Sequence, residues 1–299
     1  MLWRAAFVFL LLAASARALE VGFAEADLTP SLEEGKPVWL AGYGPGRKAE
    51  GVHDPLMARC LVLRDGENSL AFVSVDLVGL QRSEVLAVRK RLPHIERVIV
   101  TSTHNHEGPD CIGIWGPTFV QRGVDDAYLA LVVERVVDAV NRAMEDIKPC
   151  RARFGTADGA ELVSDSRRPI VKDSLLRILR FDRPEAKAGD APLGVLVQWN
   201  SHPESLGKAN RLITADFPYG TVAALKERYA CGVVYFSGAV GGLMAPPGDD
   251  VKNSEGEVVH EGTFEYAEGH GRNVAELAGK AIDAAEPIEL TPFAGQTQV

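Results

Sequence analysis

The sequence predicts a single α/β domain in which mixed β-sheets are flanked by helices. Short apolar, β-branched runs typical of strands alternate with longer segments whose apolar residues recur at helical spacing. Two of the strands are joined through a short helix, as in a β-α-β unit, so they should lie parallel and side by side. With 299 residues, of which 46% are hydrophobic and 24% charged, the chain is long enough to bury a sizeable core.

The beginning of the chain has the pattern of a secretory signal peptide. Arg4 gives a positive start, residues 5–14 form an unbroken apolar run, and Ala16-Arg17-Ala18 has the small-x-small form of a cleavage site. The apolar run is too short to span a bilayer. We therefore expect residues 1–18 to be removed, residues 19–299 to form the folded domain, and the protein to be secreted or periplasmic.

Charge and cysteine content narrow the possible partners and sites. The formal charge of −9 gives no basic footprint, so nucleic acid is not an expected partner. The four cysteines allow three pairings in an exported protein, and their spacing does not choose among them. Cys60 lies inside an apolar run and is expected to be a buried small residue. No Cys-x-x-Cys is present, which argues against a thiolate zinc site.

In the first half of the chain, turn and cap residues separate the expected elements. Asp65-Gly66 lies between two apolar runs and predicts a hairpin. Ser83 as an N-cap and Pro93 as a stop frame a short helix before the next strand. Residues 31–55 are rich in Gly and Pro and are expected to form a surface loop, whereas residues 125–147 have the spacing of an amphipathic helix. The strands expected here cover residues 19–27, 57–64, 69–75 and 96–100, and the short helix covers 84–91.

In the second half, the same signals recur. Residues 184–192 are Pro, Ala, Gly and charged, which is typical of a loop tip. Asp216 as an N-cap and Pro218 in the first turn begin a helix that should run to Tyr229. Residues 243–265 are expected to form a long loop, either a lid or a solvated segment. The strands expected here cover residues 151–157, 175–181, 194–199 and 232–236, and the last helix covers 266–285.

Two of the expected strands end in polar residues that include histidine. His104 and His106 follow the strand at 96–100 and, in an extended backbone, would project to the same face. His202 follows a second strand in the same way. One His-x-His is more often structural, but one sheet edge can gather histidines from two strands, and ligands bind at the carboxyl edge of open α/β sheets. A bound metal with His104 and His202 as ligands is therefore the leading site hypothesis.

Further residues are candidates for the same site. His106 is a third metal ligand or a free proton shuttle. Arg167 lies in a polar loop ahead of a strand and is a candidate electrophile or substrate clamp, although paired arginines are usually solvated. An open catalytic zinc site needs about three protein ligands. A carboxylate from Asp76, Asp216 or Glu204 could complete the set, but Asp76 could equally accept hydrogen bonds from loop amides.

Three motifs, in this order along the chain, resemble the neutral/alkaline non-lysosomal ceramidase family. They are Gly51-Val52-His53-Asp54-Pro55-Leu56-Met57-Ala58-Arg59, Thr101-Ser102-Thr103-His104-Asn105-His106-Glu107-Gly108-Pro109 and Trp199-Asn200-Ser201-His202-Pro203. The resemblance implies two sheets packed together and a secreted or membrane-associated zinc amidase that hydrolyses ceramide to sphingosine and a fatty acid. It places the family's two zinc-ligand histidines on His104 and His202. Its substrate-facing histidine falls on His106 and its active-site arginine on Arg167.

The sequence also departs from the family pattern. Where the family has a Gly-Asp-x-Ser-Pro element with a catalytically important serine, this chain has Gly238-Ala239-Val240-Gly241-Gly242. The family's remaining zinc ligands, a Glu and a Tyr, come from sequence further along than this chain extends, as does the immunoglobulin-like domain of the larger members. A fragment, a minimal member with a different metal shell and a relative without this chemistry are all open interpretations.

The sequence thus favours a secreted zinc-dependent hydrolase of an amide bond in a lipid-like substrate, with one zinc ion and a metal-activated water as the attacking group. A small-molecule or lipid substrate follows from this, and contact with a membrane surface is left open. One alternative is an inactive secreted relative that binds a lipid or glycan. Another is a metallohydrolase of a different superfamily acting on esters or amides, but a metallo-β-lactamase would need a following Asp-His and a barrel would need more β-α units.

Overall fold

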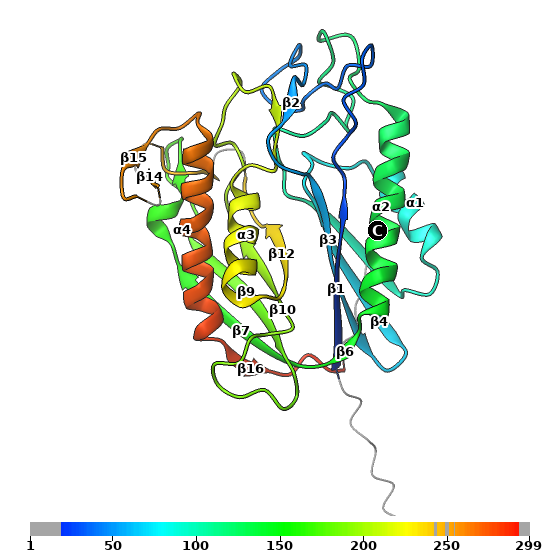
Figure 1. The fold of residues 1–299 in the computed structure, drawn as a ribbon, viewed down its shortest axis with the longest axis vertical. Helices are drawn as coiled ribbons and strands as arrows, with labels where there is room; N and C mark the ends of the chain where they lie inside the picture. Colours follow the sequence, from blue (N-terminus) through cyan, green and yellow to red (C-terminus); the bar gives the residue numbers. More distant parts are fainter. Residues whose placement is uncertain (1–18, 242–243, 249–250, 254, 293–299) are drawn as a thin grey trace, which may run out of the picture.

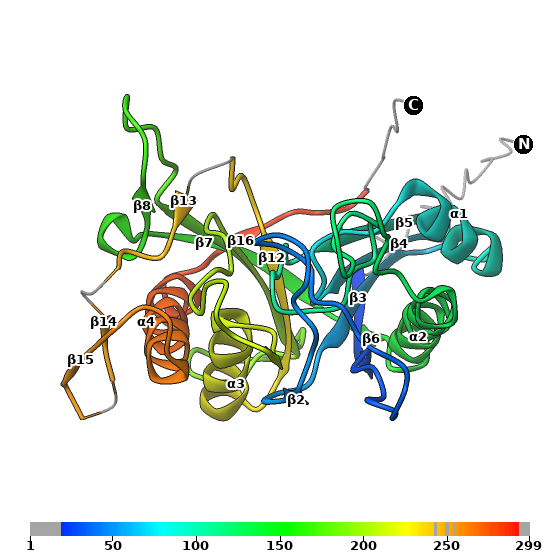
Figure 2. The same cartoon turned by 90° about the horizontal axis from the view of Figure 1, so that it is seen from above.

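The computed structural model describes residues 19–241, 244–248, 251–253 and 255–292. The predicted signal peptide lies outside the described residues. Within the described part, the chain forms one α/β domain with two main five-stranded mixed sheets and four α-helices. The sheets face each other, and each carries two helices on its outer side (Figures 1 and 2). The predicted fold class is therefore confirmed, including the packing of two sheets that the family resemblance implied.

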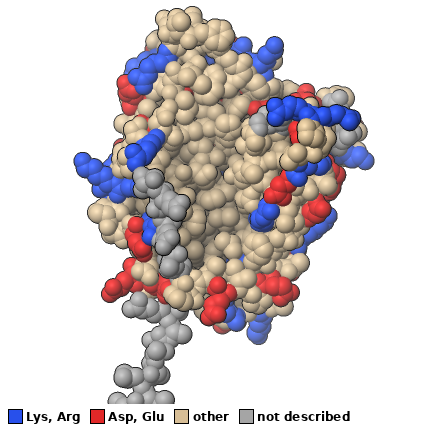
Figure 3. Space-filling model, turned by 180° about the vertical axis from the view of Figure 1, so that it is seen from behind, with Lys and Arg blue, Asp and Glu red and all other residues tan. Residues whose placement is uncertain are grey.

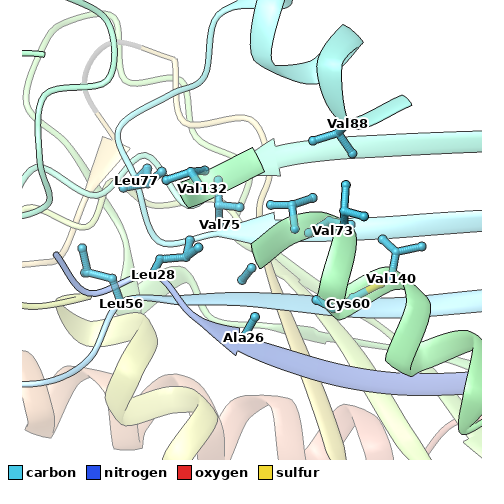
Figure 4. Close-up of a cluster of buried hydrophobic side chains, with 14 of the residues drawn as sticks. Ala26, Leu28, Leu56, Cys60, Val73, Val75, Leu77, Val88, Val132 and Val140 are labelled. Carbon is cyan, nitrogen blue, oxygen red and sulfur yellow. The ribbon is translucent and has the colours of Figure 1, made fainter. Parts of the chain in front are cut away.

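The first sheet has the strand order β5-β4-β3-β1-β6. The pairs β1–β3 and β3–β4 are antiparallel, whereas β4 and β5 are parallel and joined through α1, which confirms the predicted hairpin and β-α-β unit. Figure 4 shows Cys60, Val73 and Val75 of the strands packed against Val132 and Val140 of α2. The elements are β1 (Leu19–Asp27), β3 (Met57–Asp65), β4 (Asn68–Val75), α1 (Arg82–Arg91), β5 (Arg97–Ser102), α2 (Asp126–Glu145) and β6 (Lys148–Pro149).

The second sheet has the strand order β12-β10-β9-β7-β16. The pair β10–β12 is parallel, and the pairs β9–β10, β7–β9 and β7–β16 are antiparallel. Helices α3 and α4 cover its outer face (Figure 2). The elements are β7 (Arg151–Asp158), the 3-10 helix η1 (Ala160–Leu162), β9 (Leu175–Asp182), β10 (Gly194–Trp199), α3 (Phe217–Tyr229), β12 (Gly232–Ser237), α4 (Phe264–Asp283) and β16 (Glu286–Ile288).

Three pairs of two-residue strands tie loops together around the two sheets. Three of the short strands lie in the predicted loop 243–265, which is therefore only partly irregular within the described residues. The pairs are β2 (Gly51–Val52) with β11 (Leu212–Ile213), β8 (Ser164–Asp165) with β13 (Met244–Ala245), and β14 (Val251–Lys252) with β15 (Val258–Val259).

The inner faces of the two sheets are in contact at an aromatic ring. The ring of Phe23 in the first sheet fills the space above two glycines of the second sheet. Phe23 lies over Gly194 and Gly232, and a Cβ at these glycines would come within 2.3 and 2.5 Å of the ring. Such a distance is well inside van der Waals contact, so only glycine lets the sheets approach this closely. Apolar residues continue both inner faces to Ile99 and Phe154, which are exposed. Seen from behind, the middle of the molecule is hollowed and free of charged side chains (Figure 3).

Cap residues account for most helix starts, with one exception. Asp125 and Asp216 are the N-caps of α2 and α3 and accept hydrogen bonds from amides of the first turn. The predicted cap of α1 is wrong, because this helix begins at Arg82 and Ser83 lies inside it. The Ser83 hydroxyl instead donates to Glu84. Among the described residues, no helix combines the length and apolar character needed to cross a bilayer.

All four cysteines, which lie among the described residues, are free thiols in the structure. Cys60 is completely buried, as its position in an apolar strand predicts. Burial raises the pKa of this thiol above its ordinary range. It therefore packs as a small apolar residue and is a poor nucleophile at neutral pH.

One buried histidine belongs to the core of the second sheet. His270 on α4 is 0% exposed, and no described residue hydrogen-bonds to either ring nitrogen. Its ring lies edge-on to Phe217, with centroids 4.7 Å apart, and is stacked near Tyr266 at 6.4 Å. Burial lowers the pKa of His270 to about 3, because the apolar surroundings disfavour the charged imidazole.

We expect His270→Leu to make the protein less sensitive to acid. Above pH 6.5 neither the folded nor the unfolded state protonates this ring, but at lower pH only the unfolded state gains the proton until about pH 3. The wild type should therefore lose about 2 kcal/mol of stability relative to the variant between pH 7 and pH 5. Urea unfolding at both pH values measures this difference. His94→Leu, which removes an exposed imidazole, should keep the wild-type pH dependence; an identical dependence for His270→Leu would contradict the assignment.

Candidate functional site

The site lies where the carboxyl ends of two parallel strand pairs meet. Strands β4 and β5 of the first sheet and β10 and β12 of the second end at the same end of the molecule (Figure 1). The two edge strands are joined directly there, because the Ser237 hydroxyl donates to the carbonyl oxygen of Thr103 at 2.6 Å. Ser237 is thus a structural contact between sheets. The segments that follow these strands are brought to one place.

Three histidines come together at this end. The ring centroids of His104 and His202 are 5.1 Å apart, those of His104 and His106 are 4.9 Å apart, and those of His106 and His202 are 6.0 Å apart. The predicted convergence of histidines from two strands is therefore present. The predicted reason is wrong for the His-x-His pair, because β5 ends at Ser102 and His104 has a left-handed backbone with φ of +65°. A turn, and not an extended strand, brings these two rings together.

The two predicted metal ligands are held in the same way. Nδ1 of His104 lies 2.8 Å from the carbonyl oxygen of Val78, and Nδ1 of His202 lies 2.8 Å from that of Met244. A carbonyl only accepts, so each Nδ1 carries a proton, and in the neutral form of the ring Nε2 is then the atom with the lone pair. No described residue hydrogen-bonds to either Nε2. Metal-binding histidines characteristically have their second nitrogen fixed in this manner.

The third imidazole has a different partner. Nδ1 of His106 lies 3.0 Å from Oε1 of Glu204. The ring is also edge-on to Tyr43, with centroids 5.2 Å apart. Burial raises the pKa of Glu204, but contact with His106 and the neighbouring histidines outweigh it, so that the pKa of the carboxyl group is lowered overall. Glu204 is therefore ionised and lies at ion-pair distance from His106, although no described residue forms a well-aligned hydrogen bond with Nδ1 of that ring.

The other two candidate carboxylates are occupied elsewhere. Asp76 is buried and accepts from Arg59 at 2.6 Å and from the amide of Met57 at 2.9 Å, as the alternative interpretation of Asp76 expected. Asp216 accepts from the amides of Phe217 and Ser205. Burial raises the pKa of Asp216 to about 6. Neither group faces the histidines as an available ligand.

The match to a protein family covers most of the chain, including all three motifs. The N-terminal model of the neutral/alkaline non-lysosomal ceramidase family matches residues 19–241. The chain belongs to this family. The resemblance found in the sequence is thereby confirmed.

Two solved ceramidases have a similar fold. Neutral ceramidase from Pseudomonas aeruginosa matches with a TM-score of 0.74 and 18% identity, over 89% of this chain and 45% of that chain. A ceramidase complexed with C2 matches with a TM-score of 0.73 and 20% identity, over 89% of this chain and 44% of that one. The chain therefore spans less than half the length of either ceramidase.

The ceramidase motifs support one another in space. Asp54 of the first motif accepts from the Thr214 hydroxyl and, at 2.8 Å, from the amide of Ala215, next to the helix cap Asp216. Arg59 of the same motif pairs with Asp76, at the end of the strand beside the one that leads to His104. The first motif thus positions the backbone around the histidines and is not itself part of the cluster.

The donor set fits part of a zinc site. Two neutral imidazoles with Nε2 free are suitable zinc ligands. Burial lowers the pKa of His104, which keeps the ring in the neutral form that binds a metal. Among the described residues, no group of three or more His, Cys, Asp or Glu is arranged to hold a metal ion. His104 and His202 thus fit as two ligands of a zinc site that the described residues alone do not complete.

Arg167 does not join the histidine cluster. It is exposed, and its amide donates to Asp165, which shapes the turn after β8. Arg167 lines a neighbouring cavity of about 410 Å³ together with Met244, whose carbonyl oxygen fixes His202. Gly241, where the ceramidase pattern has serine, lines the same cavity with φ of +59°. Arg167 thus lies at a cavity that is connected to the site only through Met244, and no histidine lines this cavity.

A buried ion pair that the sequence analysis missed fixes the loop above His106. Arg47 donates to Glu107 at 2.5 Å and to the carbonyl oxygens of Ala41 and His106 at 2.8 and 2.9 Å. Asn210 donates to the same Glu107 at 2.8 Å. Burial raises the pKa of Glu107 to about 8, although Arg47 and Asn210 oppose this shift. Three chain segments are tied together by these groups behind His106.

Unfavourable backbone conformations gather at the same place. Apart from Ala230, which ends α3, the non-glycine residues with positive φ among those described are Tyr43, His104 and Asp216. Each such residue costs about 1–3 kcal/mol and persists only where surrounding contacts impose it. Their concentration around the three histidines is typical of a functional site.

We expect Arg47→Met to destabilise the protein by roughly 3–5 kcal/mol, because the buried Glu107 carboxyl group loses its partner and must either stay charged without a cation or take up a proton. Chemical unfolding at pH 9, above the pKa of about 8, measures this loss. Adding Glu107→Gln to Arg47→Met should restore part of the stability, since the second change removes the ionisable group.

Arg211→Met is the matched control, because the Arg211 guanidinium is half-buried nearby and donates only to carbonyl oxygens. It should cost less than about 1 kcal/mol. Equal losses for Arg47→Met and Arg211→Met would show that the buried pair does not support this loop.

Proposed function

We propose that the chain is a secreted or periplasmic zinc-dependent hydrolase that cleaves an amide bond in a lipid-like substrate. The observation that carries the proposal is the pair of imidazoles from separate sheets, His104 and His202, each with Nδ1 fixed by a backbone carbonyl and Nε2 left free. Membership of the ceramidase family supports the amide of an N-acylated lipid as the substrate class.

In this proposal His104 and His202 would hold one zinc ion, each offering its Nε2 lone pair. The chemistry that zinc supplies when bound is polarisation of a carbonyl and a lowered pKa, about 7, for a bound water. Further ligands are required beyond the two imidazoles, because no third His, Cys, Asp or Glu of the described residues completes the set.

His106 is proposed to move protons. Its Nδ1 faces the carboxylate of Glu204, so Nε2 is the atom that can accept a proton from the attacking water and return it to the leaving nitrogen. The carboxylate lies at 3.0 Å and offers a partner for the proton on Nδ1. This arrangement makes His106 a base and then an acid without moving the ring.

Arg167 is proposed to bind the carbonyl oxygen of a substrate that enters the neighbouring cavity. The attacking group in this proposal is water, because Gly241 takes the position of the family serine and the Ser237 hydroxyl is bonded to Thr103. The same glycine favours the second candidate, a relative that binds an N-acylated lipid in this cavity without cleaving it.

Zinc analysis of the purified full chain tests the metal assignment. The wild type should hold about one zinc per chain, and His104→Ala and His202→Ala should each lower the zinc affinity by tenfold or more, because each removes one of two identified ligands. Plasma mass spectrometry after dialysis against a weak chelator measures the content. His94→Ala, an exposed histidine, is the matched control. Equal zinc content in all four proteins would refute the site.

Turnover of a short-chain N-acylsphingosine in the presence of zinc tests the reaction. His106→Gln should lower kcat by about 10²–10⁴-fold, because it removes the proton-transfer group. Its zinc content should stay at the wild-type level. Arg167→Ala should lower kcat/KM, with the same zinc content. If the wild type binds zinc and the substrate but never turns it over, the binding relative is the correct function.

A further inference from the structure

The most exposed apolar side chains of the described residues lie at the end of one loop. Phe119 is 88% exposed and Val120 is 94% exposed. They belong to residues 117–121, Pro-Thr-Phe-Val-Gln, which we call the tip and which has no charged residue. Exposing a large aromatic ring and a branched aliphatic chain side by side to water is unfavourable, and such apolar surface is typical of an interaction site.

The base of this loop is rigid. The Asp110 carboxylate accepts from the amides of Ile112, Gly113, Trp115 and Gly123, at 3.0, 2.7, 3.1 and 3.2 Å. The two sides of the loop also touch closely. A Cβ at Gly116 would lie 1.9 Å from the carbonyl oxygen of Gln121, and one at Gly123 would lie 2.0 Å from that of Trp115. The base therefore holds the tip outward.

The tip lies at the same end of the molecule as the histidine site. The amide of Gly46 donates to the carbonyl oxygen of Gly116 at 2.8 Å, which joins the base of the tip to the loop 40–47. That loop covers His106, because Tyr43 is edge-on to the ring and a Cβ at Gly42 would lie 2.6 Å from it. Figure 1 shows these loops together beyond the carboxyl ends of the strands.

Further apolar residues are exposed in the loops of this part of the chain. They are Leu32, Tyr43 and Ile114. A lipid-like substrate that reaches His106 from a bilayer would approach from this end.

We propose that the tip inserts into the interfacial layer of a zwitterionic phospholipid bilayer and thereby places the histidine site at the lipid surface. A narrow projecting tip offers much less area than the roughly 800 Å² per partner of a stable protein interface. A rigid aromatic and aliphatic pair suits shallow, reversible insertion among headgroups. The formal charge of −9 opposes attraction to anionic lipids. The choice of a bilayer as the partner rests on the proposed function, in which the substrate is a lipid.

Binding of the full chain to large unilamellar vesicles of phosphatidylcholine tests the inference. The wild type should co-sediment with these vesicles, and Phe119→Ser with Val120→Ser should lower the partition coefficient by about tenfold or more, because the inserted apolar area is lost. Phe119→Trp should bind like the wild type. Its added fluorescence should shift to the blue with vesicles and be quenched by lipids brominated near the headgroup.

Leu86→Ser with Val258→Ser is the matched control. These side chains are 44% and 53% exposed, on α1 and in β15, and neither lines the cavity at Arg167. The control pair should bind within twofold of the wild type. Equal losses for both pairs, binding only to anionic vesicles, or an added fluorescence of the Phe119→Trp variant that vesicles do not change would each overturn the inference.

The measurement separates this inference from the proposed reaction. Vesicle binding is measured without zinc and without turnover. The inference about the tip therefore stands even if the protein does not hydrolyse the substrate. Hydrolysis of a water-soluble short-chain substrate should be the same for Phe119→Ser with Val120→Ser and for the wild type, whereas hydrolysis of substrate presented in vesicles should fall with binding. Equal rates on both substrates for both proteins would refute a role for the tip in reaching lipid.

Discussion

The site depends on two sheets that end at the same level. Each contributes a parallel strand pair, β4 with β5 and β10 with β12, and the edge strands β5 and β12 are joined by the hydrogen bond from Ser237 to the Thr103 carbonyl. Lower in the sandwich, Phe23 against Gly194 and Gly232 sets how closely the sheets approach. A shift of one sheet along the other by a residue would move His202 away from His104 by about 3.3 Å, more than a shared ion would tolerate.

Buried charge fixes the loops between these strands. The pairs Arg47–Glu107 and Arg59–Asp76 are almost completely inaccessible to solvent. Such pairs contribute little net stability, because removing two ions from water costs about as much as their attraction returns. Their value here is positional: each guanidinium binds one carboxylate, and Arg47 also binds carbonyls from three separate segments. The carbonyl oxygen of His106 is one of these acceptors, so the backbone from which the His106 ring extends is fixed in position.

Local patterns predicted the elements well and the site only in part. Strand limits were predicted to within a residue or two, because apolar runs and turn residues act over short distances. The prediction of Ser83 as an N-cap was wrong because the helix begins one residue earlier, at Arg82. A single polar residue does not indicate where a helix begins. His104 was placed in an extended strand, yet its position depends on a left-handed turn that its backbone makes against Leu77. Glu107 and Arg47 are 60 residues apart, and no spacing rule connects them.

The tautomers of His104 and His202, the two proposed ligands, limit what the site can bind. Because the carbonyl oxygens of Val78 and Met244 each accept a hydrogen bond from Nδ1–H, both rings, when neutral, offer an acceptor at Nε2, and they cannot donate to each other. A neighbouring pair of acceptors, 5.1 Å apart between ring centres, is best satisfied by a cation. His106 differs, because its Nδ1 faces a carboxylate and not a carbonyl oxygen. In the proposed function, this difference in partners assigns two of the imidazoles to the metal and the third to proton transfer.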